Sequence, residues 1–277
     1  MRVWLALVAG AALCSPASAT GLQHVVETAS SGGVQAQFSY DFIAPATFSN
    51  EHLTIKREGT VLVDREIRPF RFGTAWPANY WNHRRSVFAR DLDGDSEPEV
   101  YLTLYWGGAH CCEYTQVYRY GASGSYSLRT HVWGNPGVRL GELGADALPE
   151  FVSGDDRFAY QFTDYADSSW PIQIWSYRAG VFSNVTRRFP QTIANDARRQ
   201  WRFLSGRRAD GQRVRGALAA WAGDECLRSR CGYAFGKVDA LRRAGRLRVS
   251  YACPCDATAA AYVAHLHRFL RRTGYLR

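Results

Sequence analysis

One internal repeat constrains the fold of this chain more than any other feature. Residues 90–100 align with residues 141–151 at a constant offset of 51, and residues 116–120 match residues 173–177 at an offset of 57. A turn, a strand and a later hairpin therefore recur together. This recurrence predicts consecutive antiparallel β-meanders, because each copy supplies one supersecondary unit that packs against its neighbour.

The region around the repeat is predicted to be mainly β. Apolar residues alternate along residues 34–40, and turn-forming residues separate the candidate strands. Beyond the first hairpins these strands are residues 86–89, 99–105, 115–120, 126–132, 151–153, 158–162, 172–177 and 181–185. At roughly 50 to 60 residues per unit the region supplies about three units, whereas closed propellers typically have four or more blades. We therefore expect propeller-blade-like meanders that do not close.

The chain divides into three segments of different character. Residues 1–19 are predicted to be a signal peptide, residues 20–189 a β-repeat domain, and residues 190–277 an arginine-rich, helical segment. Residues 187–277 carry a net charge of +14, whereas residues 20–186 carry −6. The last helix is predicted from apolar residues at helical spacing, namely Tyr262, Val263, Leu266, Phe269 and Leu270.

The N-terminus has the pattern of a secretory signal. Arg2 precedes an apolar run of about eleven residues, and Ala17 and Ala19 flank Ser18 in a small-residue cleavage site. The run is too short to cross a bilayer, which takes about 20 residues, and no later stretch is long enough either. We expect a periplasmic or secreted protein without a transmembrane segment.

An oxidising compartment favours disulfides over metal sites for paired cysteines. Six cysteines follow the signal peptide as three close pairs: Cys111 and Cys112, Cys226 and Cys231, and Cys253 and Cys255. Fifteen connectivities are open for six cysteines. Adjacent Cα atoms lie about 3.8 Å apart, against the roughly 4.4–6.8 Å usual for a disulfide, so a Cys111–Cys112 bridge would be strained. We expect two bridges between the second and third pairs, which would staple the last third of the chain.

The loop at residues 91–99 is the strongest candidate for a functional site. Carboxylates occupy its positions 1, 3, 5 and 9, and a main-chain carbonyl is available at position 7: Asp91, Asp93, Asp95, Glu99 and, for the carbonyl, Glu97. When such a loop coils tightly, these oxygens converge into the flexible all-oxygen cage that Ca²⁺ prefers. An acidic turn without an ion is the alternative. The second copy, at residues 142–150, has Gly144 in place of the position-3 carboxylate and is expected to bind poorly.

This loop resembles the short calcium loops of FG-GAP or VCBS-type repeats, which occur in integrin α-chain propellers and in many secreted bacterial proteins. The resemblance covers about residues 87–189 and implies that the loop is a structural clip between strands. Ser96 stands where those loops usually carry Gly. Residues 107–112, Gly-Gly-Ala-His-Cys-Cys, are similar to a string found beside such loops in exported bacterial proteins of unknown function.

His110 lies beside two cysteines, which suggests a nucleophilic Cys-His pair as one hypothesis. Adjacent side chains on a strand point to opposite faces, so His110 is not placed to activate Cys111. We expect a structural disulfide beside a packed histidine, with a redox or ligand role as the alternative.

Together these patterns favour an exported, calcium-stabilised binding or structural protein of the periplasm or cell envelope, not a catalyst. Its partner would be another protein or an anionic envelope polymer. One alternative is a periplasmic hydrolase that uses carboxylates near the repeat loops, although the sequence has no nucleophile elbow or zinc-protease motif. Another is a binder of anionic envelope polymers through the arginine-rich C-terminal segment. A nucleic-acid partner is not expected, because no nucleic-acid-binding module is recognisable.

The signal sequence predicts a mature N-terminus at or near Thr20, because signal peptidase cleaves after small residues such as Ala19. N-terminal sequencing of exported protein measures this directly. Exported protein that still begins with Met1 would contradict the prediction.

Overall fold

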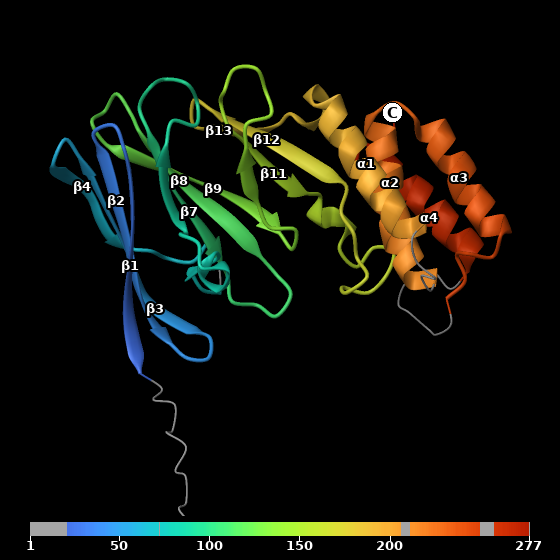
Figure 1. The fold of residues 1–277 in the computed structure, drawn as a ribbon, viewed down its shortest axis with the longest axis horizontal. Coiled ribbons are helices and arrows are strands. Elements are labelled where there is room, and N and C mark those ends of the chain that lie inside the picture. Colours follow the sequence, from blue (N-terminus) through green and yellow to red (C-terminus); the bar gives the residue numbers. More distant parts are fainter. Residues whose placement is uncertain (1–20, 72, 206–210, 250–257, 277) are drawn as a thin grey trace, which may run out of the picture.

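The computed structural model describes residues 21–71, 73–205, 211–249 and 258–276. The predicted signal peptide, Cys253 and Cys255 lie outside these described residues. The described residues form three antiparallel sheets in a row, followed by helices that gather at the end of the row next to the third sheet (Figure 1).

The first and third sheets are meanders whose strands follow one another in sequence, whereas in the second sheet the first two strands both pair with the third. The first sheet contains β1 (Leu22–Ser31), β2 (Val34–Ile43), β3 (Thr47–Arg57) and β4 (Thr60–Glu66). The second contains β5 (Trp76–Pro77), β6 (Val87–Arg90), β7 (Glu99–Tyr105), β8 (Glu113–Tyr120) and β9 (Tyr126–Gly134). The third contains β10 (Arg139–Gly141), β11 (Glu150–Gly154), β12 (Ile172–Arg178) and β13 (Val181–Asn184). The prediction of a mainly β fold of open antiparallel meanders is confirmed.

The helical part follows the third sheet, as predicted. Its helices are α1 (Pro190–Ser205), α2 (Gly211–Leu227), α3 (Cys231–Arg243) and α4 (Ala259–Arg272). Residues 217–222 of α2 are at most 3% exposed, because this stretch is apolar on all sides and lies at the centre of the helical core. The hydroxyl of Thr258 caps α4 by accepting a hydrogen bond from the main-chain N–H of Ala261 at 3.0 Å.

The strand predicted at residues 158–162 is wrong. Short 3₁₀ helices lie between the larger elements: η1 (Tyr80–Asn82), η2 (Asp156–Phe158) and η3 (Thr186–Arg188). Phe158 at the end of η2 and Phe162 in the following turn pack edge-on against Phe269 of α4, with ring centroids 4.8 and 5.2 Å apart. A short apolar run looks the same in sequence whether it forms a buried strand or a buried turn.

Separate apolar cores hold the row of sheets together. Phe38 and Leu53 of the first sheet pack with Val100 of the second in one cluster. Trp133 of the second sheet packs with Phe151 of the third in another cluster. A third cluster joins the third sheet to α1, and the largest fills the helical part. Each seam between neighbouring layers is therefore stabilised by its own buried side chains.

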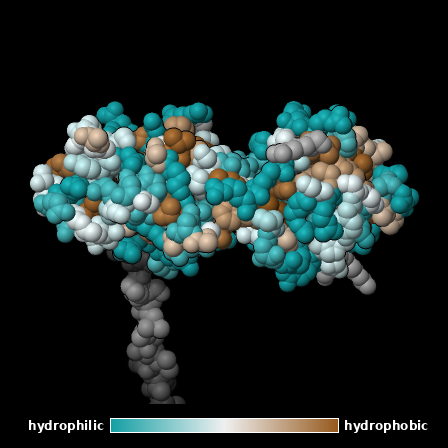
Figure 2. Space-filling model, turned by 90° about the horizontal axis from the view of Figure 1, so that it is seen from above, coloured by the Kyte–Doolittle hydropathy of each residue, from teal (hydrophilic) through white to brown (hydrophobic). Residues whose placement is uncertain are grey.

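The outer surface is mostly polar. Seen from above, polar residues cover much of both the sheet part and the helical part, apolar residues are scattered among them, and the surface is indented between the two parts (Figure 2). None of the described helices combines the length and the apolar character needed to cross a bilayer.

His131 of β9 lies in the seam between the second and third sheets. Its ring contacts Trp133, Trp175 and Phe182, with centroids 4.1, 4.4 and 4.8 Å away. Burial lowers the pKa of His131 from 6.5 to about 4, because the charged imidazolium is poorly solvated among these rings. The unfolded chain therefore binds this proton more readily, and the seam loses stability as the pH falls from 6.5 towards 4.

Replacing this histidine by an aromatic residue that does not titrate should reduce the acid sensitivity of the fold. We expect wild type to lose about 1 to 2 kcal/mol more than His131→Phe between pH 7 and pH 4.5, after allowance for partial exposure. Urea unfolding at the two pH values measures the difference. Equal losses in both proteins would contradict the prediction.

Candidate metal centre

The acidic loop at residues 91–99 connects β6 to β7 and coils around the side chain of Asp91. Asp91 Oδ1 accepts hydrogen bonds from the main-chain N–H groups of Asp93 at 3.2 Å and Gly94 at 2.7 Å. Asp91 Oδ2 accepts one from Ser96 N–H at 3.0 Å. Ser96 has a φ of +69°, a left-handed conformation that favours glycine, which is the residue usual in the calcium loops that this one resembles.

Three of the predicted ligands converge on one point. Carboxylate oxygens of Asp91, Asp93 and Glu99 all lie within 4.8 Å of one another. Asp93 Oδ1 and Glu99 Oε1 are buried and accept no hydrogen bond from any described residue. Buried carboxylate oxygens that lack donors are costly unless a cation neutralises them. This donor set, three carboxylates on a tightly coiled loop, suits a hard cation.

The other two predicted ligands turn their side chains towards arginines. Glu97 forms a two-pronged ion pair with Arg57 of β3, at 2.9 and 3.0 Å. Asp95 Oδ2 accepts a hydrogen bond from Arg119 of β8 at 2.5 Å. The predicted role of the Glu97 main-chain carbonyl stays a prediction.

Arg119 of β8 lies beside the converging carboxylates of the loop. Its Nε lies 2.9 Å from Asp93 Oδ2 and 3.5 Å from Glu99 Oε1. Burial nevertheless raises the pKa of Glu99 to about 8, and the neighbouring carboxylates of Asp93 and Asp95 raise it further, while the Leu92 N–H and Arg119 oppose the shift. The five carboxylates of the loop have two arginine partners between them, Arg57 and Arg119. An excess of negative charge therefore remains beside the buried oxygens Asp93 Oδ1 and Glu99 Oε1.

The second loop, at residues 142–150, forms the same turn, but its carboxylates do not converge. Glu150 accepts a hydrogen bond from Leu143 N–H at 3.1 Å, just as Glu99 accepts one from the equivalent residue of the first loop at 2.8 Å. Arg178 lies 3.8 Å from Asp146 and 3.7 Å from Glu150 and so faces both remaining acids. Within the described residues, no three carboxylates of this loop come together.

Contacts from all three sheets meet at the first loop. The Glu97–Arg57 ion pair joins it to the first sheet. On the other side, Asp93 Oδ2 accepts a hydrogen bond from Ala179 N–H at 3.0 Å, and Arg178 donates to the Leu92 carbonyl oxygen at 2.7 Å. The β12–β13 hairpin of the third sheet therefore docks on the acidic loop of the second.

The sequence did not identify these contacts beyond the loop. For Arg119 a local signal exists: β7 and β8 form a hairpin in which Val100 pairs with Tyr118, so Arg119 follows alongside Glu99. Arg57 and Ala179 come from other sheets, and no spacing along the chain indicates them.

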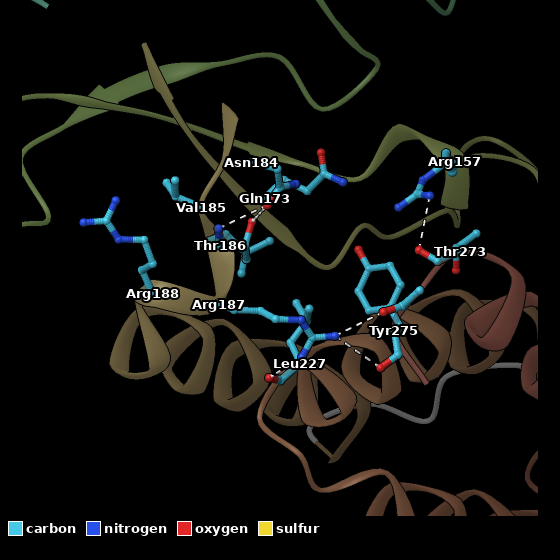
Figure 3. Close-up of a pocket in the computed structure, with 12 residues that line it drawn as sticks. Arg157, Gln173, Asn184, Val185, Thr186, Arg187, Arg188, Leu227, Thr273 and Tyr275 are labelled. Atoms are coloured by element: carbon cyan, nitrogen blue, oxygen red, sulfur yellow. Dashed lines mark hydrogen bonds between the residues drawn. The ribbon is translucent and has the colours of Figure 1, made fainter. Parts of the chain in front are cut away.

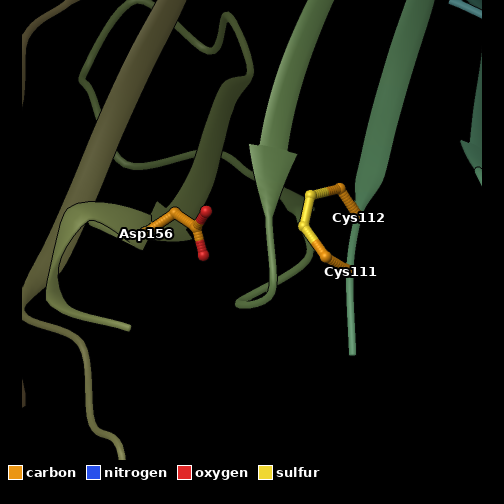
Figure 4. A group of neighbouring side chains, drawn as sticks. All are labelled: Cys111, Cys112 and Asp156. Carbon is orange, nitrogen blue, oxygen red and sulfur yellow. A yellow bond between two sulfur atoms is a disulfide. The ribbon is translucent and has the colours of Figure 1, made fainter. Parts of the chain in front are cut away.

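The cysteines pair differently from the prediction. Cys111 is joined to Cys112, although adjacent Cα atoms were expected to lie too close for a bridge, and the peptide bond between the two residues is cis (Figure 4). Cys226 is joined to Cys231, so the predicted bridges from this pair to the third pair are wrong. The end of α2 and the start of α3 meet at a tight corner, where the two Cα atoms lie 4.3 Å apart.

The surroundings of the first disulfide are polar and aromatic. Asp156 extends from η2 towards the Cys111–Cys112 bridge, and its Oδ1 accepts hydrogen bonds from the main-chain and side-chain amides of Asn135 at 2.9 and 2.7 Å (Figure 4). The ring of His110 contacts Tyr165, with centroids 4.4 Å apart. The disulfide predicted here is present, whereas His110 is exposed and is not packed in the interior.

A cavity of about 370 Å³ lies between the third sheet and the helices (Figure 3). Arg157 on its wall pairs with Asp155 at 2.8 Å. Arg187 donates to the carbonyl oxygens of Leu227 at 3.0 Å and Gly274 at 3.1 Å, which end α2 and follow α4. These two arginines satisfy protein groups of their own, so they act here as structural ties.

Several other arginines of the C-terminal segment are also paired within it. Arg228 contacts Glu225 at 2.7 Å, and Arg242 contacts Asp239 at the same distance. Part of the net positive charge of this segment therefore lies on arginines that bond to other groups of the protein.

Comparison with known proteins gives two partial matches. No protein-family profile matches the chain. The chain is 38% identical over 99 residues to a probable thylakoid lumen protein of Synechocystis sp., a match that covers 35% of this chain and 29% of that protein. It is 25% identical over 197 residues to the uncharacterized protein y4bJ of Sinorhizobium fredii, which covers 69% of this chain and 30% of that protein. The matched region is less than a third of either relative.

The pairing of Cys226 with Cys231 predicts a specific cross-link. Trypsin cleaves after Arg228 and Arg230, between the two cysteines, so a non-reduced digest should contain two short peptides joined by a disulfide. Mass spectrometry before and after reduction measures this.

The same digest should contain Cys111 and Cys112 in one peptide, two hydrogens lighter than its reduced form. A cross-link from Cys226 or Cys231 to Cys253 would contradict the observed pairing and restore the arrangement expected from sequence.

Proposed function

We propose that this chain is an exported protein in which Ca²⁺ bound by the 91–99 loop clamps the three sheets together for a binding or structural role. The observation that carries the proposal is the pair of buried oxygens, Asp93 Oδ1 and Glu99 Oε1, that converge with Asp91 and accept no hydrogen bond from described residues. A bound dication would satisfy both oxygens and offset the excess negative charge.

Ca²⁺ fits this donor set better than Mg²⁺ does. Every candidate donor is an oxygen, and the coiled loop offers carboxylates and a main-chain carbonyl at flexible distances. Mg²⁺ demands octahedral geometry at about 2.0–2.1 Å and keeps several waters, whereas Ca²⁺ accepts six to eight oxygens at about 2.3–2.6 Å. The resemblance to FG-GAP and VCBS-type loops supports the same ion.

The position of the loop supports a structural role for the ion. The loop is tied to β3 by Glu97 and to the β12–β13 hairpin by Asp93, so an ion in it would stiffen both seams of the sheet row. The carboxylates are engaged by main-chain N–H groups and arginines. We infer that the ion would rigidify a surface that binds another molecule, either a protein or an anionic envelope polymer.

Export is supported by independent observations. The N-terminal sequence has the pattern of a signal peptide, and the two disulfides among the described residues suit an oxidising compartment. The Synechocystis relative is described as a probable thylakoid lumen protein, which also lies outside the cytoplasm. We assign this chain to the periplasm or the exterior of the cell.

The clamp predicts that calcium stabilises the folded protein. If Ca²⁺ binds only the folded state, the free energy of unfolding should rise by about 2.7 kcal/mol at a hundredfold excess over Kd. Asp93→Ala should abolish most of this increment, because it removes a buried oxygen aimed at the ion. Urea unfolding with Ca²⁺ and with a chelator measures the increment, and calorimetry should give one ion per chain.

Asp146→Ala is the control, because it removes an acid of the second loop, at the position equivalent to Asp95, and should leave the calcium increment intact. The same unfolding midpoint with Ca²⁺ and with chelator in wild type would show that the loop is only an acidic turn. A variant Asp93→Ala that stays folded but loses a measurable hydrolysis would favour the hydrolase alternative.

A further inference from the structure

A second cavity lies at the other end of β6 from the acidic loop. It has a volume of about 510 Å³, within the range of small-molecule sites. One wall comes from β6 and β7 of the second sheet, and the other comes from β10 and β11 of the third. The cavity therefore opens in the seam between these two sheets.

The rim of this cavity is cationic. Four basic side chains line it: His83, Arg84, Arg85 and Arg139. All four are exposed, and no acidic residue is among the described residues that line the cavity. The side chains of Arg84 and Arg139 form no hydrogen bond or ion pair with any part of the chain that the structure describes. The arginines of the 370 Å³ cavity differ, because Arg157 and Arg187 are held by protein acceptors.

The interior of the cavity is aromatic. Phe88 of β6 stacks on Tyr101 of β7, with centroids 4.8 Å apart and planes inclined by 13°. Phe151 of β11 meets Tyr101 edge-on at 6.0 Å. Such a wall offers a ligand apolar contact area below the charged rim.

The segment that carries the cationic rim is fixed before any ligand arrives. Asn79 accepts a hydrogen bond from Arg84 N–H at 3.2 Å on its carbonyl oxygen, and its side-chain amide donates to the Arg85 carbonyl oxygen at 3.0 Å. Arg85 Nη1 donates to the Thr28 carbonyl oxygen of β1 at 2.7 Å. The main chain that carries Arg84 is therefore preorganised, whereas the unbonded side chains of Arg84 and Arg139 lose rotamer freedom when a ligand binds.

We propose that this cavity binds a small organic anion, a sugar-sized molecule that carries a carboxylate or a phosphate group. The planar guanidinium groups of Arg84 and Arg139 grip the anionic group from opposite walls, since such groups match carboxylate and phosphate geometry. The body of the ligand lies against Phe88 and Tyr101. The site shares no residue with the calcium loop and stands whether or not that loop binds an ion.

The test is calorimetric titration of the whole mature protein at constant ionic strength. The probes are galacturonate, glucose 6-phosphate, inorganic phosphate and uncharged glucose. We expect at least one of the two sugar anions to bind, and whichever binds identifies the anionic group. Glucose should not bind, and inorganic phosphate should bind at least tenfold more weakly than the better sugar anion.

Variants locate the binding. The double variant Arg84→Gln/Arg139→Gln should weaken the affinity at least tenfold, because it removes both charged donors. Its melting temperature should stay at the wild-type value, since neither side chain bonds to a described residue. Arg268→Gln/Arg271→Gln, which removes two exposed charges from α4, is the matched control and should bind like wild type.

Three results would overturn the proposal. One is the absence of binding by both sugar anions at millimolar concentration. Another is an equal loss of affinity in Arg268→Gln/Arg271→Gln and in Arg84→Gln/Arg139→Gln, which would indicate non-specific attraction to net charge. The third is inorganic phosphate binding as tightly as the sugar anions, which would show that the aromatic wall contacts no ligand body.

Discussion

The negative charge buried at the 91–99 loop is the constraint on which the arrangement of the sheets depends. Ionised carboxylates removed from water need compensating charge or donors, and the chain brings them from three directions. Arg57 comes from the first sheet, Arg119 from the second, and the N–H of Ala179 from the third. The sheets are thus held in register by a shared electrostatic requirement as well as by their apolar seams.

Much of this architecture could be predicted from sequence, because its signals are local. The repeat at an offset of 51 predicted the recurring turn, and Glu99 and Glu150 indeed close their turns with equivalent hydrogen bonds to Leu92 and Leu143. The convergence of Asp91, Asp93 and Glu99 followed from their spacing, whereas Asp95, which the same spacing included, turns to Arg119 instead. The arginine partners could not be predicted, because they depend on how whole sheets pack against each other.

Two of the wrong predictions share one physical origin. The bridges expected between the second and third cysteine pairs assumed that longer loops are the better partners. Helices α2 and α3 instead meet at a corner that brings Cys226 beside Cys231. The strand expected at residues 158–162 instead forms a turn that fills the helical core with Phe158 and Phe162. In both places tertiary packing of the helices overrode the local pattern.

The acidic loop and the cationic cavity lie in the same seam between the second and third sheets. The loop fixes that seam through Asp93 and the β12–β13 hairpin, whereas the cavity takes Arg84 from one sheet and Arg139 from the other. The separation of these two guanidinium groups therefore depends on the angle between the sheets. An ion that stiffens the loop would hold the two walls at a fixed spacing, so the proposed clamp at one end of β6 would preorganise the proposed binding cavity at its other end.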